Sequence, residues 1–221
     1  MTQVLIIGSS GGIGRALASA AAARGCDVTG LSRSADGFDI TDEASVEAHL
    51  SKLDGPFDTI ILATGALEVN GAKPEKSIKA VTAQAMMDQF ATNAIGPALV
   101  LRHAARLLTK DGRAVCAVLS ARVGSIGDNR LGGWTSYRAA KAAVNQIVHT
   151  TAIELSRSHT HSICVALHPG TVATPFTQSY LGRHPSVPPQ DAANNLLNVI
   201  DGLSPQDIGG FFDWAGKVIP W

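Results

Sequence analysis

Residues 4–14 read Val-Leu-Ile-Ile-Gly-Ser-Ser-Gly-Gly-Ile-Gly, an apolar run that passes directly into a turn with four glycines. The run predicts a buried strand over residues 4–7, and the Ala-rich segment beyond the turn predicts a helix over residues 14–24. Glycines let a backbone turn tightly and approach a phosphate group, to which a helix N-terminus offers amide donors. Tight turns also need glycine for steric reasons alone, and the spacing Gly-x-x-x-Gly-x-Gly differs from the usual dinucleotide pattern Gly-x-Gly-x-x-Gly. The place between strand and helix favours pyrophosphate binding, with Gly8, Ser10, Gly11, Gly12, Ile13 and Gly14 as candidate contacts.

The same alternation of apolar runs and longer helical segments continues along the chain. Further strands are predicted over residues 27–31, 38–40, 58–63, 114–119, 162–167 and 210–213. Further helices are predicted over residues 42–53, 86–109, 135–158 and 188–203, with Thr41 as the cap of the first and Gly96-Pro97 as the break in the second. Continuous apolar strands are typical of a parallel sheet covered on both faces. The pattern predicts an α/β fold, a Rossmann-type doubly wound sheet, mostly or wholly parallel, in a single domain over residues 1–221.

The composition excludes several classes of protein. The 221 residues include 18 Lys and Arg against 18 Asp and Glu, so the formal net charge is zero, and 45% of them are hydrophobic. A disordered chain would be less hydrophobic and more charged, and a nucleic-acid-binding protein would show a basic excess. A membrane span needs about 20 consecutive apolar residues, far more than any run here. Residues 1–3 lack the basic region of a signal peptide. We expect a compact cytoplasmic protein that binds neither nucleic acid nor membrane.

Cysteine and histidine residues give no sign of a disulfide framework or a metal centre. Cys26, Cys116 and Cys164 are odd in number and far apart, which favours buried free thiols in a reducing compartment. His159 and His161 are the closest histidine pair, but no cysteine or carboxylate lies near them at the spacing of metal ligands. No metal is therefore expected.

The segment after the second strand, Gly30-Leu31-Ser32-Arg33-Ser34, bears on the choice of dinucleotide. An acid here would bind the adenosine ribose of NAD, whereas Arg33 could pair with the 2′-phosphate of NADP. The alternative is a solvated loop arginine, so NADP(H) is favoured and NAD(H) stays open. Only five residues separate Arg33 from Asp39, and a full crossover needs at least about 10–12. We expect a shortened connection that leaves the adenosine end of the cofactor exposed.

Tyr137-Arg-Ala-Ala-Lys141 lies inside the predicted helix over residues 135–158. A spacing of four places both side chains on one helix face. An ammonium beside a phenol favours the phenolate and lowers the tyrosine pKa, which suits an acid or base that works on a carbonyl or alcohol. Taken alone, this spacing is common and indicates a surface pair. Its position one strand and one loop after Leu119-Ser120 favours the catalytic reading.

These motifs together resemble the short-chain dehydrogenases/reductases. The matching positions span nearly the whole chain: residues 8–14, Asp39-Ile40, Asn93, Ser120, Tyr137, Lys141 and residues 169–174. Residues 120–126, 132–138 and 219–221 are most similar to the branch that contains the C-factor signalling proteins and the sniffer-like carbonyl reductases.

The resemblance implies a role for each matching residue. Tyr137 would be the catalytic acid/base, and Lys141 would hold the nicotinamide ribose. Asn93 would support a water in a proton relay, although it could equally be a helix-kink residue beside Gly96-Pro97. Asp39 would contact adenine. The other implied cofactor contacts are Ile40, Ala63, Thr64, Gly65, Pro169, Gly170, Val172 and Thr174, the last bonding the carboxamide or the phosphates.

The chain departs from the family at the end of the strand over residues 114–119. Relatives carry two serines there, the second of which polarises the substrate carbonyl, but this chain has Ser120 followed by Ala121. Ser120 could take the role after a one-residue shift, which we favour, Ser125 could fold back, or the hydroxyl could be absent. The usual Asn-Ala-Gly is also replaced, by Ala63-Thr64-Gly65.

Two functions are consistent with these residues. The favoured one is an NADP(H)-dependent oxidoreductase that interconverts a ketone or aldehyde and an alcohol, with Tyr137 as acid/base. The alternative is a dinucleotide-binding signalling or regulatory protein with weak or vestigial catalysis, which Ala121 supports. Residues 123–133, Trp134 and residues 175–189 would form the wall around a small neutral substrate, although Trp134 could simply pack at the helix start. As in relatives, two long helices would assemble a homodimer or homotetramer.

Overall fold

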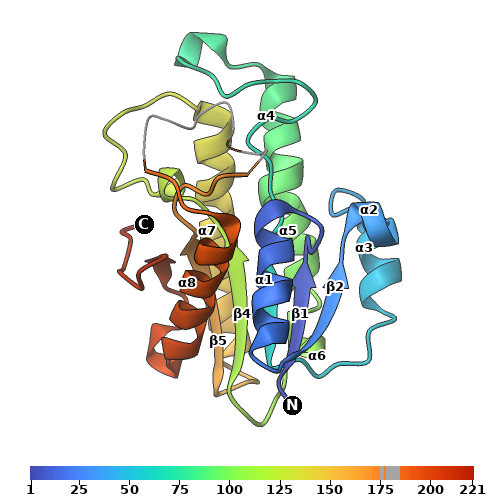
Figure 1. Cartoon of the computed structure of the whole chain (residues 1–221). Coiled ribbons are helices and arrows are strands. Elements are labelled where there is room, and N and C mark those ends of the chain that lie inside the picture. Colours follow the sequence, from blue (N-terminus) through green and yellow to red (C-terminus); the bar gives the residue numbers. More distant parts are fainter. Residues whose placement is uncertain (175–176, 178–184) are drawn as a thin grey trace.

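The computed structural model describes residues 1–174, 177 and 185–221, which form a parallel sheet between two layers of helices (Figure 1). In this part of the chain the six strands are β1 (Gln3–Ile7), β2 (Asp27–Leu31), β3 (Thr59–Leu62), β4 (Ala114–Leu119), β5 (Ser162–His168) and β6 (Phe211–Asp213). All neighbouring strands pair in parallel, in the order β2-β1-β3-β4-β5-β6. The order reverses between β1 and β3, and ligands of such sheets bind at the carboxyl ends of the strands beside this point. The predicted fold class is confirmed.

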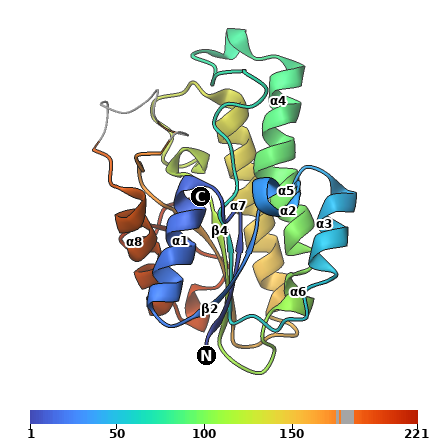
Figure 2. The same ribbon diagram turned by 45° about the vertical axis from the view of Figure 1, so that its right-hand side comes forward.

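The helices pack on the sheet through two apolar layers. One face of the sheet is covered by α1 (Gly12–Ala23) and α8 (Pro189–Gly202), and the other by α3 (Glu43–Leu50), α5 (Gly96–Leu101) and α7 (Thr135–Leu155), as Figure 2 shows. Every residue of β4 is buried, as expected for a central strand with helices on both sides. No helix among the described residues combines the length and apolarity that a membrane crossing needs.

The predicted strand over residues 38–40 is wrong. A short helix, α2 (Arg33–Asp36), follows β2 instead, and the chain then turns back at Gly37, so that the Phe38 amide donates to the Ser32 carbonyl at 3.2 Å. β2 therefore remains the edge of the sheet, since the connection is too short to reach a position beyond it. Phe38 and Ile40 are buried from a loop, which explains their apolar character.

The cap of α3 also differs from the prediction. The Asp42 carboxylate accepts the Ala44 amide at 3.0 Å, while the Thr41 hydroxyl donates to Asp39 at 2.7 Å. Asp42 is therefore the N-cap, and the helix spans Glu43–Leu50 rather than residues 42–53. Both side chains are suitable caps, and the bond to Asp39 decides between them.

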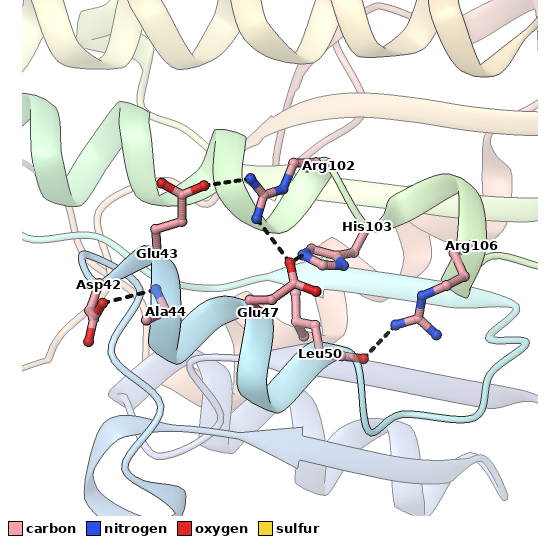
Figure 3. A network of polar contacts seen from close by, with 8 residues as sticks. All are labelled: Asp42, Glu43, Ala44, Glu47, Leu50, Arg102, His103 and Arg106. Carbon is pink, nitrogen blue, oxygen red and sulfur yellow. Dashed lines mark hydrogen bonds and ion pairs between the residues drawn. The ribbon is translucent and has the colours of Figure 1, made fainter.

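A polar network holds α3 against α5 and against α6 (Ala104–Leu107), as Figure 3 shows. The Arg102 guanidinium lies 2.6 Å from Glu43 and 3.1 Å from Glu47. His103 Nε2 lies 3.4 Å from the same Glu47 carboxylate, and Arg106 donates to the Leu50 carbonyl at 2.5 Å. The network therefore fixes α3 to the end of α5 and to α6.

The long helical segment predicted over residues 86–109 begins earlier and contains a π-helical turn. α4 (Ala83–Phe90) leads into a π turn over Ala91–Ile95 and then into α5, with the Gly96 amide bonded to the Ala91 carbonyl. The wider turn lies directly before Pro97, which has no amide hydrogen and whose ring would crowd the carbonyl four residues earlier in a regular helix. The helix therefore passes through Gly96-Pro97 and ends at Leu101. Asn93 lies within the π turn.

Candidate active site

The glycine-rich turn brings the backbone of β1 close to the start of α1. The Gly8 amide donates to the Leu31 carbonyl at 2.7 Å, and the Gly11 amide donates to the Gly8 carbonyl at 3.1 Å. A Cβ atom on Gly14 would lie 2.1 Å from the Gly8 oxygen, so the tight turn itself requires this glycine. Among the described residues no side chain caps α1 at Gly11. The first amides of the helix are therefore available to a bound anion.

Two cavities adjoin this turn and contain most of the predicted site. The larger has a volume of about 460 Å³ and the smaller about 400 Å³. Of the predicted residues, the larger is lined by Ser10, Gly11, Gly12, Ile13, Ala63, Thr64, Gly65, Ser120, Tyr137, Lys141, Pro169, Gly170, Val172 and Thr174. The smaller is lined by Gly8, Ser10, Gly11, Arg33, Asp39, Ile40, Ala63, Thr64 and Gly65. The residues common to both join the cavities at the switch point, while Gly14 and Asn93 lie behind the walls.

Tyr137 and Lys141 are buried on one face of α7, at the inner end of the larger cavity. The two side chains are 5% and 4% exposed, and Lys141 Nζ lies 5.8 Å from the centre of the Tyr137 ring. The ammonium also donates to the Leu119 carbonyl at the end of β4, at 3.1 Å. The pair is therefore part of the cavity and not an accident of surface spacing.

The pKa of Tyr137 is raised above its ordinary value, because burial disfavours the phenolate. The prediction that the neighbouring lysine lowers this pKa is wrong: the sequence shows the neighbour but not the depth of burial. Burial also lowers the pKa of Lys141 to about 8. At neutral pH the phenol is therefore a proton donor, and the lysine beside it is largely charged.

Glu75 fixes the start of the helix that carries Tyr137. Its carboxylate accepts the Ser136 amide at 3.2 Å and the Ser136 hydroxyl, and its own carbonyl accepts the Trp134 amide at 2.5 Å. The carboxylate thus serves as an N-terminal cap supplied from 61 positions away. The Trp134 ring meets the Tyr137 ring edge to face at 6.3 Å, so it packs at the helix start, one of the two roles considered for it.

Asn93 ties the loop after β3 to the π turn. Its Oδ1 accepts the Ala66 amide at 3.1 Å, and its Nδ2 donates to the Ala66 carbonyl at 2.9 Å and to Gln89 at 2.7 Å. A Cβ atom added to Gly65 would lie 3.0 Å from Asn93 Oδ1 and 3.2 Å from Lys141 Nζ. Asn93 and Lys141 therefore approach each other around Gly65, and the proton relay stays a prediction.

The hydroxyls of both candidate serines are already engaged. Ser120 lines the larger cavity, and its Oγ donates to Asn145 Oδ1 at 2.6 Å. Ser125 donates to the Pro220 carbonyl at 2.5 Å and accepts the Asp128 amide at 3.0 Å, so it anchors residues 219–221 to this loop. Ala121 lines the larger cavity at the aligned position of the family serine. The role of Ser120 stays a prediction.

At the smaller cavity, Arg33 lies on the same side as Asp39. Two hydrogen bonds from Thr41 hold the pKa of Asp39 below its usual range, with a smaller effect from the Arg33 guanidinium. Sequence reasoning missed an acid here: the Asp36 carboxylate accepts the Ser32 amide at 2.8 Å. Asp36 does not line the smaller cavity. Among the described residues, the charged side chains that line this cavity are Arg33, Asp39 and Glu68.

Other residues of the site were not expected from the sequence. Arg15, His168 and Thr177 also line the larger cavity, and burial lowers the pKa of His168 to about 4. Asn145 follows Lys141 by four positions, which is a signal that the sequence does contain. Of the predicted substrate wall, Thr177 lines this cavity, while the described residues 123–133 and Trp134 do not. Residues 175–176 and 178–184 lie outside the described residues.

Comparisons with known proteins agree with this geometry. A family model of short-chain dehydrogenases, described as enoyl-(acyl carrier protein) reductase, matches residues 7–211. The 1-hydroxy-2-glutathionyl-2-methyl-3-butene dehydrogenase of Rhodococcus sp. (strain AD45) is 31% identical and is covered completely, as is this chain. The C-signal protein of Myxococcus xanthus is 35% identical over 62% of this chain and 78% of its own length.

A solved structure extends the similarity to three dimensions. The NADPH-bound carbonyl reductase from chicken fatty liver has a TM-score of 0.76 and 25% identity, over 100% of this chain and 99% of that one. The family match covers the glycine-rich turn, the Tyr137–Lys141 pair and the strands that join them. This chain therefore belongs to the short-chain dehydrogenase/reductase family of oxidoreductases.

Proposed function

We propose that this protein is an NADP(H)-dependent oxidoreductase that interconverts a ketone or aldehyde and an alcohol by hydride transfer, with Tyr137 as the acid/base. The observation that carries the proposal is the buried Tyr137–Lys141 pair in a cavity whose other wall is the glycine-rich turn. A proton donor and an anion-binding turn are the two parts that such a reaction needs from the protein.

The residues fit a dinucleotide phosphate. The uncapped amides of α1 would hold the pyrophosphate, with the two cavities on either side for its two halves. Arg33 at the smaller cavity would pair with the 2′-phosphate, and the NADPH of the chicken enzyme supports this choice over NAD(H). When bound, the cofactor supplies or accepts the hydride. Thr174, beside Gly12, would fix the nicotinamide end.

The chain's own residues would move the proton. Tyr137, protonated at neutral pH, donates to the carbonyl oxygen during reduction and takes the proton back during oxidation. The Lys141 ammonium would stabilise the phenolate that remains, and Asn93 would support a water through which a replacement proton is relayed by way of Lys141. Ser120 provides a second hydrogen bond to the oxygen.

The character of the larger cavity supports a small, neutral substrate. Among its described lining residues no carboxylate is present, and the charged groups are Arg15 and Lys141. The name of the Rhodococcus dehydrogenase specifies an alcohol, which supports the same class of reaction. We further propose that the protein is cytoplasmic and forms a homodimer or homotetramer. Sedimentation analysis of the purified protein would test the oligomeric state.

The test is NADPH consumption with a panel of ketones and aldehydes, comparing the wild type with Tyr137→Phe. Turnover should fall by at least about 10²-fold, while NADPH binding measured by fluorescence should be retained. Equal turnover by the two proteins would exclude Tyr137 as the acid.

A second candidate is a dinucleotide-binding signalling protein with vestigial catalysis. Ala121, at the aligned place of the family serine, favours it, as does the similarity to C-signal. Calorimetric binding of NADPH without turnover of any carbonyl in the panel would support this candidate over the enzyme.

A further inference from the structure

Three side chains succeed one another on the inner face of α7. Tyr137, Lys141 and Asn145 are spaced by four residues, and all three are buried. Lys141 donates to the Leu119 carbonyl, and Asn145 accepts from Ser120, the next residue of the same strand end. α7 is therefore hydrogen-bonded to two adjacent residues at the end of β4, Leu119 and Ser120.

The bond between Ser120 and Asn145 conflicts with the proposed action of Ser120 on a substrate. A hydroxyl has one proton, and that of Ser120 is directed at Asn145 Oδ1, 2.6 Å away. In this state Ser120 Oγ can only accept further hydrogen bonds. A carbonyl oxygen also only accepts, so the two cannot pair.

The side-chain amide of Asn145, in contrast, has a donor that is not used. Its Nδ2 is buried and has no hydrogen-bond partner among the described residues. A buried amide donor without a partner is unfavourable, because folding has removed its water. A half rotation of the side-chain amide exchanges Nδ2 and Oδ1, and it would bring this donor to Ser120.

We infer that Asn145 is a positioning residue that sets the direction of the Ser120 proton. With the amide rotated, Asn145 Nδ2 donates to Ser120 Oγ, and Ser120 donates to the substrate oxygen. The arriving oxygen favours this state because every donor in the chain of hydrogen bonds then has an acceptor. The inference rests on the proposed function, and it explains how Ser120 can act although Ala121 stands at the family position.

Asn145→Asp tests the inference with a side chain of the same shape. An ionised carboxylate can only accept, so it locks the Ser120 proton, whereas the protonated acid can donate as the amide does. We expect kcat for carbonyl reduction to fall by about 10²-fold at high pH and to recover as the new carboxyl is protonated. The change should lie in kcat rather than in the KM for NADPH.

The pH profile is read against that of the wild type, because other groups titrate nearby. Lys141 and His149 lie one helical turn to either side of Asn145, and Tyr137 lies two turns away. His168 directly follows Leu167, the β5 residue that pairs with Leu119. The thiols of Cys116 and Cys164 lie deeper along the same strands. A transition present in Asn145→Asp and absent from the wild type belongs to the introduced carboxyl.

Three further variants separate positioning from a packing role. Ser120→Ala should show a similar loss at every pH, and Ser120→Ala/Asn145→Asp should be no slower than Ser120→Ala. Asn145→Ala frees the Ser120 proton, so its kcat at high pH should exceed that of Asn145→Asp although more of the side chain is lost. If Asn145→Asp does not fold, the cycle of Ser120→Ala and Asn145→Ala is used instead, and non-additive losses are expected.

Three results would overturn the inference. The first is a wild-type pH profile and kcat in Asn145→Asp. The second is full activity of Ser120→Ala while Tyr137→Phe is inactive, which removes the role of Ser120 and leaves the proposed function standing. The third is strictly additive losses in the cycle of Ser120→Ala and Asn145→Ala. Failure of the proposed function itself would appear separately, as full activity of Tyr137→Phe.

Discussion

Replacement of the buried lysine, Lys141→Met, should stabilise the protein at neutral pH while it abolishes activity. Burial lowers the pKa of Lys141 to about 8, whereas an unfolded chain gives lysine a pKa of about 10.4. The unfolded chain therefore binds the proton more tightly. At pH 7 this difference disfavours the folded state by about 3 kcal/mol, at about 1.4 kcal/mol for each pKa unit.

The free energy gained by removing the charge is partly offset. Methionine leaves the Leu119 carbonyl without the donor that lies 3.1 Å from it, which costs about 1 kcal/mol. The variant should therefore be more stable than the wild type by about 2 kcal/mol at pH 7. Above about pH 8 the folded wild type loses its proton while the unfolded chain keeps it, so wild-type stability rises with pH. Beyond about pH 10.5 the variant should be the less stable protein, by about 1 kcal/mol.

Urea unfolding followed by tryptophan fluorescence, with no dinucleotide added, measures this difference at several pH values between 7 and 10.5. The exposed Lys110 provides the matched control, since Lys110→Met should leave a small difference that does not vary with pH. A difference between Lys141→Met and the wild type that stays constant across this range would refute the reasoning. So would a variant that is less stable at pH 7.

Three further predictions concern the site. The rate of carbonyl reduction, measured by stopped-flow NADPH oxidation, should fall as pH rises through about 8, because Lys141 loses the charge that stabilises the phenolate of Tyr137. A rate that rises across this range would contradict the prediction. Arg33→Ala should weaken NADPH binding about tenfold or more and NADH binding far less in calorimetry, with the exposed Arg130→Ala as control; an equal loss for both dinucleotides would remove the phosphate contact. Glu75→Ala should lower the free energy of unfolding by about 1–2 kcal/mol through loss of the helix cap, and it should slow turnover. Glu75→Gln should restore part of the stability and part of the turnover. Unchanged stability of Glu75→Ala would show that α7 needs no cap.

Elements with a local signal could be predicted from the sequence. β4 was predicted with the bounds it has, Ala114–Leu119, because every one of its residues is apolar and buried. The strand over residues 38–40 could not be corrected from the sequence, since Phe38 and Ile40 are buried as a strand would be. Only the packing shows that they are buried from a loop at the edge of the sheet.

The residues of the candidate site likewise divide into those with a local signal in the sequence and those without one. The glycine-rich turn and the Tyr137–Lys141 pair are compact motifs, so their place at the larger cavity followed from local spacing. The contacts of Asn145 and Glu75 join residues 25 and 61 positions apart, which no local pattern specifies. The raised pKa of Tyr137 depends on burial by the whole fold, so the direction of this shift could not be predicted correctly from the neighbouring lysine alone.

The attachment of residues 219–221 to the loop after β4 makes the order of these two segments interdependent. The Pro220 carbonyl accepts the Ser125 hydroxyl, and the Trp221 carbonyl accepts the Gly127 amide at 2.7 Å. The Ser125 and Pro220 groups lie 95 positions apart in the sequence, so a local change in either segment also removes a support from the other. A substitution that removes the Ser125 hydroxyl should therefore loosen residues 219–221 as well as the loop in which it lies.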